Sequence, residues 1–70
     1  MLTLENATLI KSRANAAIRN LNAIVADLSD RVCDDDMSMI RKMVGSSIGI
    51  IITQILEPIF LQYPEIDDDI

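Results

Sequence analysis

The chain has 70 residues, half of them hydrophobic, with one Phe, one Tyr and a net charge of −5. A chain this short buries only about 60% of the surface that its unfolded form exposes, so it needs disulfides, a metal or a partner subunit. A single cysteine, Cys33, and no histidine exclude an internal disulfide, His-based catalysis and His metal sites. A partner subunit is the support that remains.

The charge of the chain and its first residues indicate which partners and which cellular location to expect. Six basic residues are scattered among eleven acidic ones, whereas nucleic-acid binding needs clustered Lys and Arg, so we expect no nucleic-acid partner. Residues 1–13 lack the basic start and apolar stretch of a signal peptide. We therefore expect a cytoplasmic protein, because a reducing compartment suits an unpaired cysteine.

The first predicted element is a helix over about residues 3–32. Its apolar residues recur at alternating steps of three and four, which is typical of an amphipathic helix. These seam residues are Ala7, Ile10, Ala14, Ala17, Leu21, Ile24 and Leu28. A second column, Ile18, Val25 and Val32, widens the apolar face. Thr3 is expected to cap the helix, and Glu5 to favour the positive end of its dipole.

Residues 33–36 are predicted to form a turn. Consecutive aspartates disfavour a helix interior but suit caps and first turns, so Asp34 to Asp36 should lead into a second helix. They could also suggest a divalent-cation site, but a calcium loop needs ligands spread over a longer segment with a turn glycine. We therefore expect no metal here, and a passive role for Cys33 beside three carboxylates.

The second predicted helix covers about residues 37–57. One stripe is apolar and comprises Ile40, Val44, Ile48, Ile51, Ile55 and Ile59. The opposite stripe is small or polar and comprises Ser38, Lys42, Ser46, Gly49, Thr53 and Glu57. Both repeat at steps of three and four, which excludes a strand because a strand has a period of two.

Two prolines shape the C-terminal part. Pro58 cannot donate a hydrogen bond to Gln54, so we expect a kink or a separate short helix over residues 58–63. Pro64 should end the helix, leaving residues 64–70 as a frayed acidic tail.

The second helix also permits a membrane interpretation. Residues 43–62 have the length of a span and one charged side chain, Glu57. Gly45 and Gly49 have the spacing that lets membrane helices approach closely. Several polar residues inside the window and the amphipathic first helix favour a soluble protein instead, so we do not expect a membrane partner.

The predicted fold is an all-α antiparallel helical hairpin, with residues 1–63 as a single domain. Two helices leave apolar surface uncovered, so we predict that two hairpins form a homodimeric four-helix bundle. The expected core and interface residues are Ile10, Ala14, Ala17, Leu21, Ile24, Leu28, Ile40, Val44, Ile48, Ile51, Ile55 and Ile59. Met37, Met39 and Met43 would add adaptable apolar surface near the turn, or simply pack in the core.

No catalytic motif is recognisable. The glycines Gly45 and Gly49 lie inside a predicted helix and form no phosphate-binding loop, and Glu-x-x-His metal pairs are impossible without histidine. We predict a non-catalytic, self-associating helical module for protein interaction or structure, without a cofactor. Two alternatives are a small membrane-inserting protein and an acidic inhibitor or antitoxin-like partner of a basic protein.

Overall fold

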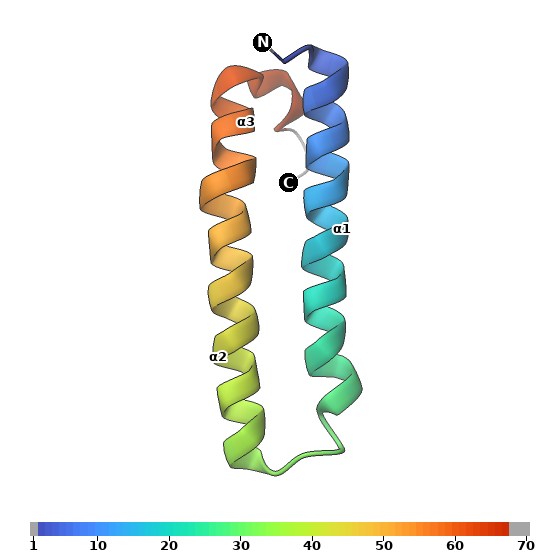
Figure 1. Ribbon diagram of the computed structural model, residues 1–70, viewed down its shortest axis with the longest axis vertical. Helices are drawn as coiled ribbons and strands as arrows, with labels where there is room; N and C mark the ends of the chain where they lie inside the picture. Colours follow the sequence, from blue (N-terminus) through green and yellow to red (C-terminus); the bar gives the residue numbers. More distant parts are fainter. Residues whose placement is uncertain (1, 68–70) are drawn as a thin grey trace.

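The computed structural model describes residues 2–67 and confirms the all-α hairpin (Figure 1). The elements are α1 (Leu4–Leu28), α2 (Asp34–Ile51), the π-helix η1 (Ile52–Leu56), α3 (Glu57–Gln62) and the 3₁₀ helix η2 (Pro64–Ile66). The elements α2, η1 and α3 are continuous and form one helical rod, Asp34–Gln62, that runs antiparallel to α1. The described residues contain no strand.

The N-terminus of α1 confirms the predicted cap. The hydroxyl of Thr3 accepts a hydrogen bond of 3.1 Å from the backbone N–H of Asn6, which is otherwise without a partner inside the helix. The predicted end at residue 32 is wrong, because α1 ends at Leu28. The N–H of Arg31 donates to the carbonyl of Leu28 and so turns the chain, and the last turn has no basic residue to favour the dipole.

The second helix begins three residues earlier than predicted. Asp34 to Asp36 form the first turn of α2 and are not part of the connecting turn. Their carboxylates lie where the backbone N–H groups and the helix dipole favour negative charge. Cys33 occupies the N-cap position without a side-chain hydrogen bond, and it is exposed and free.

The core is a narrow apolar seam between the two antiparallel rods. The buried side chains are Ala7, Ala14, Met37, Val44, Leu56 and Ile59, and no polar side chain is buried among the described residues. Ala7 is fully buried, at 0% exposure. A methyl group at this position lets α1 approach the large side chains of the opposite rod closely.

The π-helix changes the register of this seam. The N–H of Glu57 donates to the carbonyl of Ile52, five residues earlier, and Pro58 follows without an N–H of its own. Because this turn is wider than an α-helical turn, the seam residue that follows Ile51 is Leu56. Of the two neighbours, Leu56 is therefore buried in the seam, at 6% exposure, whereas Ile55, predicted for the core or the interface, is 40% exposed. The helix continues through Pro58 to Gln62.

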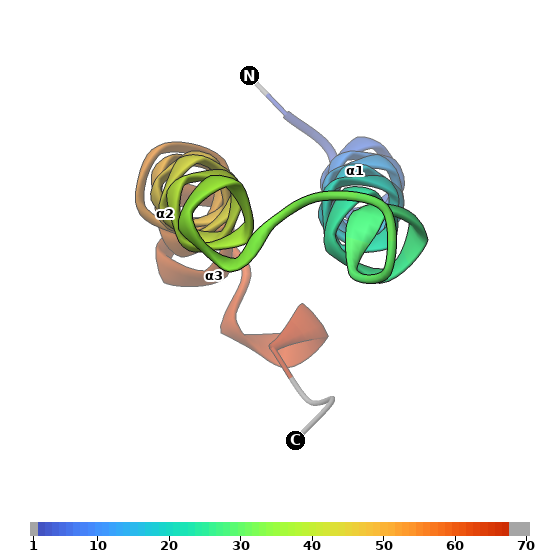
Figure 2. The same cartoon turned by 90° about the horizontal axis from the view of Figure 1, so that it is seen from below.

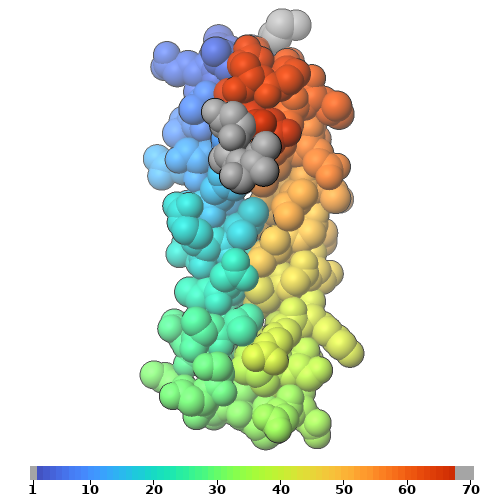
Figure 3. All heavy atoms as spheres, turned by 180° about the vertical axis from the view of Figure 1, so that it is seen from behind, coloured from blue at the N-terminus to red at the C-terminus, as the bar shows by residue number. Residues whose placement is uncertain are grey.

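The segment after Pro64 packs against α1, contrary to the predicted frayed tail. The ammonium group of Lys11 donates to the carbonyl of Ile66 and lies 5.9 Å from the centre of the Phe60 ring. The hydroxyl of Tyr63 donates to the carbonyl of Leu2. The 3₁₀ helix thus lies on one side of the hairpin (Figures 2 and 3). Residues 68–70 of the predicted tail lie outside the described residues.

Candidate functional site

Apolar side chains are enriched on one side of the hairpin. In an antiparallel helix pair, the residues that immediately precede the contact residues of both helices lie on the same side of the pair. On α1 the apolar residues at such positions are Ile10, Ala17 and Ile24, which precede the half-buried Lys11, Ile18 and Val25. The polar residues Asn6, Arg13 and Asn20 alternate with them, before Ala7, Ala14 and Leu21. On the opposite rod the apolar residues are Met39, Met43, Ile50 and Ile55, which precede Ile40, Val44, Ile51 and Leu56. We call these seven residues, Ile10, Ala17, Ile24, Met39, Met43, Ile50 and Ile55, the apolar face.

A surface hollow shows where the two rods meet on this face. It has a volume of about 380 Å³ and is lined by Leu9, Ile10, Arg13, Ala14, Ala17 and Ile55. Ile55 comes from η1 and the other residues from α1, so the outward turn of Ile55 completes the apolar lining. The guanidinium-bearing Arg13 is the charged residue of this lining and is itself exposed.

The apolar face is incompletely covered by the chain itself. Met43 is 56% exposed, and Met39, Ile50 and Ile24 are also exposed. Soluble monomers rarely leave apolar patches of more than a few hundred Å² in water, because each exposed Å² forgoes about 25 cal/mol of burial. The described part of the chain therefore leaves the large side chains of this face uncovered.

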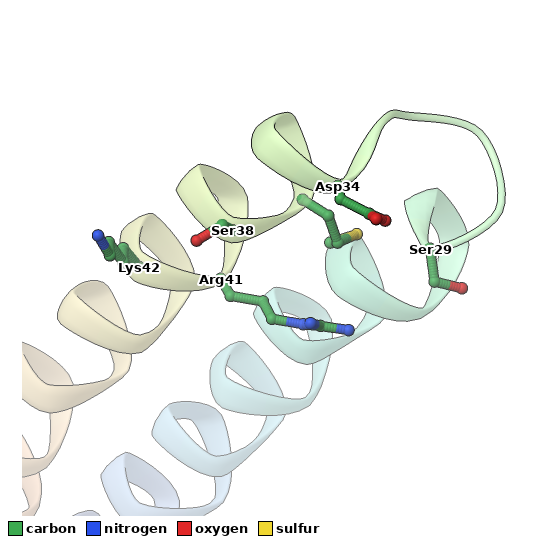
Figure 4. A pocket seen from close by; sticks show the side chains of 6 residues that line it. Ser29, Asp34, Ser38, Arg41 and Lys42 are labelled. Atoms are coloured by element: carbon green, nitrogen blue, oxygen red, sulfur yellow. The ribbon is translucent and has the colours of Figure 1, made fainter.

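The opposite side of the hairpin is polar near the turn. A hollow of about 430 Å³ is lined by Ser29, Asp34, Met37, Ser38, Arg41 and Lys42. Figure 4 shows the side chain of Arg41 extending toward α1 and that of Lys42 pointing away. Cations, a carboxylate and hydroxyls are mixed here, so the lining selects no ligand charge. This side is suited to contact with water.

The predicted interface residues differ in how far the hairpin buries them. Ala14, Val44 and Ile59 are buried. Those that are half-buried are Ile10, Ala17, Leu21, Leu28, Ile40, Ile48 and Ile51. Ile24 and Ile55 are exposed on the apolar face. The prediction omitted the buried Leu56, because a regular helical step from Ile51 reaches Ile55 and only the π-helix reaches Leu56.

Among the described residues, the two glycines of α2 make no close contact outside their own helix. A Cβ atom added at Gly45 or at Gly49 would meet no heavy atom within 4 Å. The hairpin itself therefore has no packing need for either glycine, although each lowers helix stability relative to alanine.

The described residues offer no arrangement typical of a metal centre. Within residues 2–67, no group of three or more His, Cys, Asp and Glu side chains is placed to hold a metal ion. Asp34, Asp35 and Asp36 are exposed in the first turn of α2, and they do not converge with other such groups.

Comparison with known proteins gives no relative. No protein family, curated protein or solved structure matches this chain. The rod Asp34–Gln62 has 29 residues and a mean hydropathy of 1.7 over its most apolar stretch, which is long and apolar enough to cross a membrane. The same property is found in core helices of soluble proteins.

Proposed function

We propose that this chain is a non-catalytic helical module that associates with a second copy through the apolar face. The two hairpins would pack face to face as a four-helix bundle, with Met39, Met43 and Ile50 of each copy in the shared core. The observation that carries the proposal is the exposure of these three side chains on one side of an otherwise amphipathic hairpin.

The physical support comes from size and from side-chain chemistry. Within residues 2–67, six side chains form the buried core, which is little for a domain whose single cysteine cannot form an internal disulfide. A second copy would offer an identical apolar face, so each hairpin would cover the other in a closed pair. Methionine side chains suit such a contact because they adapt to irregular gaps.

The experiment compares two substitutions by sedimentation velocity in detergent-free buffer. Met43→Glu places a carboxylate in the proposed interface, and we expect at least tenfold weaker association because that charge would be buried without a partner. Ser38→Glu adds the same charge on the polar side, beside Lys42, and should leave association unchanged. Equal behaviour of the two variants would contradict the proposal.

A second candidate function is membrane insertion through the rod Asp34–Gln62. Its specific support is that only 17% of the most apolar stretch is buried by the rest of the chain, whereas the core helix of a soluble domain is mostly buried. In this case the small-residue spacing of Gly45 and Gly49 would serve helix contact in the bilayer.

Flotation with neutral phosphatidylcholine vesicles separates the two candidates. A membrane protein of this kind floats with the vesicles and resists extraction at high salt and high pH. The proposed soluble dimer stays at the bottom of the gradient. Flotation of the wild-type chain would therefore favour insertion over the face-to-face dimer.

A further inference from the structure

The open end of the hairpin carries a hollow that is separate from the apolar face. It has a volume of about 290 Å³ and is lined by Glu57, Phe60, Leu61 and Asp67. Leu61 is 83% exposed, the most exposed large hydrophobic side chain of the described residues. The hollow thus combines an aromatic ring and a projecting leucine with two carboxylates. That combination is complementary to a side chain with a long aliphatic stem and a positive head.

The hollow is preformed by contacts within the chain. Lys11 lies over the Phe60 ring and donates to the carbonyl of Ile66, which holds the chain just before Asp67 against α1. The hydroxyl of Tyr63 donates to the carbonyl of Leu2 and fixes the bend between α3 and η2. These contacts bring Asp67 into the same hollow as Glu57. A ligand that binds a preformed site has less conformational entropy to overcome.

The electrostatics of this end favour a cation. Glu57 and Asp67 are exposed. The positive charge near them is the ammonium group of Lys11, 5.9 Å from the centre of the Phe60 ring, so the carboxylates of this end outnumber the cation. The last turn of α3 contains no basic residue, so the negative end of the helix dipole adds to the two carboxylates. Glu65 is exposed in the neighbouring 3₁₀ helix, and the whole chain carries a net charge of −5.

We propose that this hollow binds an arginine or lysine side chain of a partner protein, at a site where the basic residue has an apolar neighbour. The positive head donates hydrogen bonds to the carboxylates of Glu57 and Asp67. The aliphatic stem and the apolar neighbour pack on Leu61 and on the part of the Phe60 ring that Lys11 leaves uncovered. Arginine fits best, because its planar fork of donors can engage two carboxylates at once.

The test is an NMR titration of the full chain with the acetylated, amidated peptide Leu-Arg-Leu-Arg, and with Leu-Gln-Leu-Gln as its neutral counterpart. The arginine peptide should shift the amide signals of Phe60, Leu61 and their neighbours, and the neutral peptide should not. The double variant Glu57→Gln/Asp67→Asn should bind the arginine peptide about tenfold more weakly, because two charge-assisted contacts are lost.

A matched double variant controls for overall charge. Glu5→Gln/Asp27→Asn removes two exposed carboxylates from α1 and changes the net charge equally, so it should retain the wild-type affinity. Leu61→Ala should weaken binding while keeping the helical circular dichroism of the wild type.

Several results would overturn the proposal. They are the absence of shifts up to the solubility limit of the peptide, equal loss of affinity in both double variants, equal binding of the neutral peptide, or shifts that map to the apolar face. Sedimentation of the same samples reports self-association separately. The failure of this proposal and that of the dimer are therefore distinguishable.

Discussion

Two neighbouring residues, Ile55 and Leu56, have exchanged the places that a regular helix would give them. The π-helix that ends at Leu56 adds one residue to the turn before Pro58, so Leu56 enters the seam and Ile55 turns to the apolar face. The burial of a large aliphatic side chain contributes about 1.5–3 kcal/mol relative to its exposure. The register of this single turn therefore decides which side chain stabilises the hairpin and which is available for association.

Alanine substitutions test this register. Leu56→Ala should lower the free energy of unfolding by about 2–3 kcal/mol, because it leaves a cavity in the seam. Ile55→Ala should lower it by less than about 1 kcal/mol in the isolated hairpin. Urea unfolding at protein concentrations low enough to separate the copies would measure both values. The reverse order would place Ile55 in the seam, as a regular helix does.

The glycines of α2 give a second test of single residues. Gly45→Ala and Gly49→Ala should each raise the free energy of unfolding by about 0.5–1 kcal/mol, because alanine restricts the unfolded chain and nothing in the hairpin contacts the added methyl group. Thermal unfolding followed by circular dichroism would show the shift. Destabilisation, or weaker self-association, would mean that another chain approaches the helix at these positions.

At the level of secondary structure, the start of α1 is stabilised by its N-terminal cap and the start of α2 by its acidic first turn. Thr3→Ala should cost about 1 kcal/mol, because the N–H of Asn6 loses the hydroxyl that accepts its hydrogen bond. Hydrogen exchange at the Asn6 amide should accelerate accordingly. Thr8→Ala removes another exposed threonine of the same helix and should change stability by less than about 0.5 kcal/mol. Equal effects of both changes would contradict the capping role of Thr3.

The elements also show what the sequence can predict. The two helices and their antiparallel arrangement follow from apolar periodicity and a short acidic connection, so the hairpin was predictable. The position of Leu56 was not, because the sequence indicates a disturbed turn before Pro58 but not that this turn forms a π-helix. The packing of η2 was also missed: Lys11 and Ile66 are far apart in the sequence, and no local pattern indicates that their contact forms.

The sequence predicted that the candidate site is an uncovered apolar surface, but it did not predict which residues form that surface. The surplus of apolar residues on both helices indicated that the hairpin leaves apolar surface uncovered. Met39 and Met43 were recognised as extra apolar residues near the turn, and they lie on the apolar face. Ile24 and Ile55 were assigned to the core or interface without distinction, because periodicity alone does not separate the seam between two helices from the face beside it.

At the scale of the whole molecule, the hairpin is itself amphipathic. It measures 46 × 21 × 16 Å, with the apolar face on one broad side and polar side chains, together with the docked C-terminal segment, on the other. With one apolar and one polar side, the hairpin resembles half of a four-helix bundle. A second copy and a lipid bilayer would both cover the apolar side, but they differ in mass and in the need for detergent.

The most direct test of the central claim is the mass of the wild-type chain in detergent-free buffer, by light scattering after size exclusion, with circular dichroism on the same sample. We expect a soluble, strongly helical species of twice the chain mass of 7.8 kDa. A helical monomer that stays soluble at every concentration, or material that remains in solution only with detergent, would contradict this expectation.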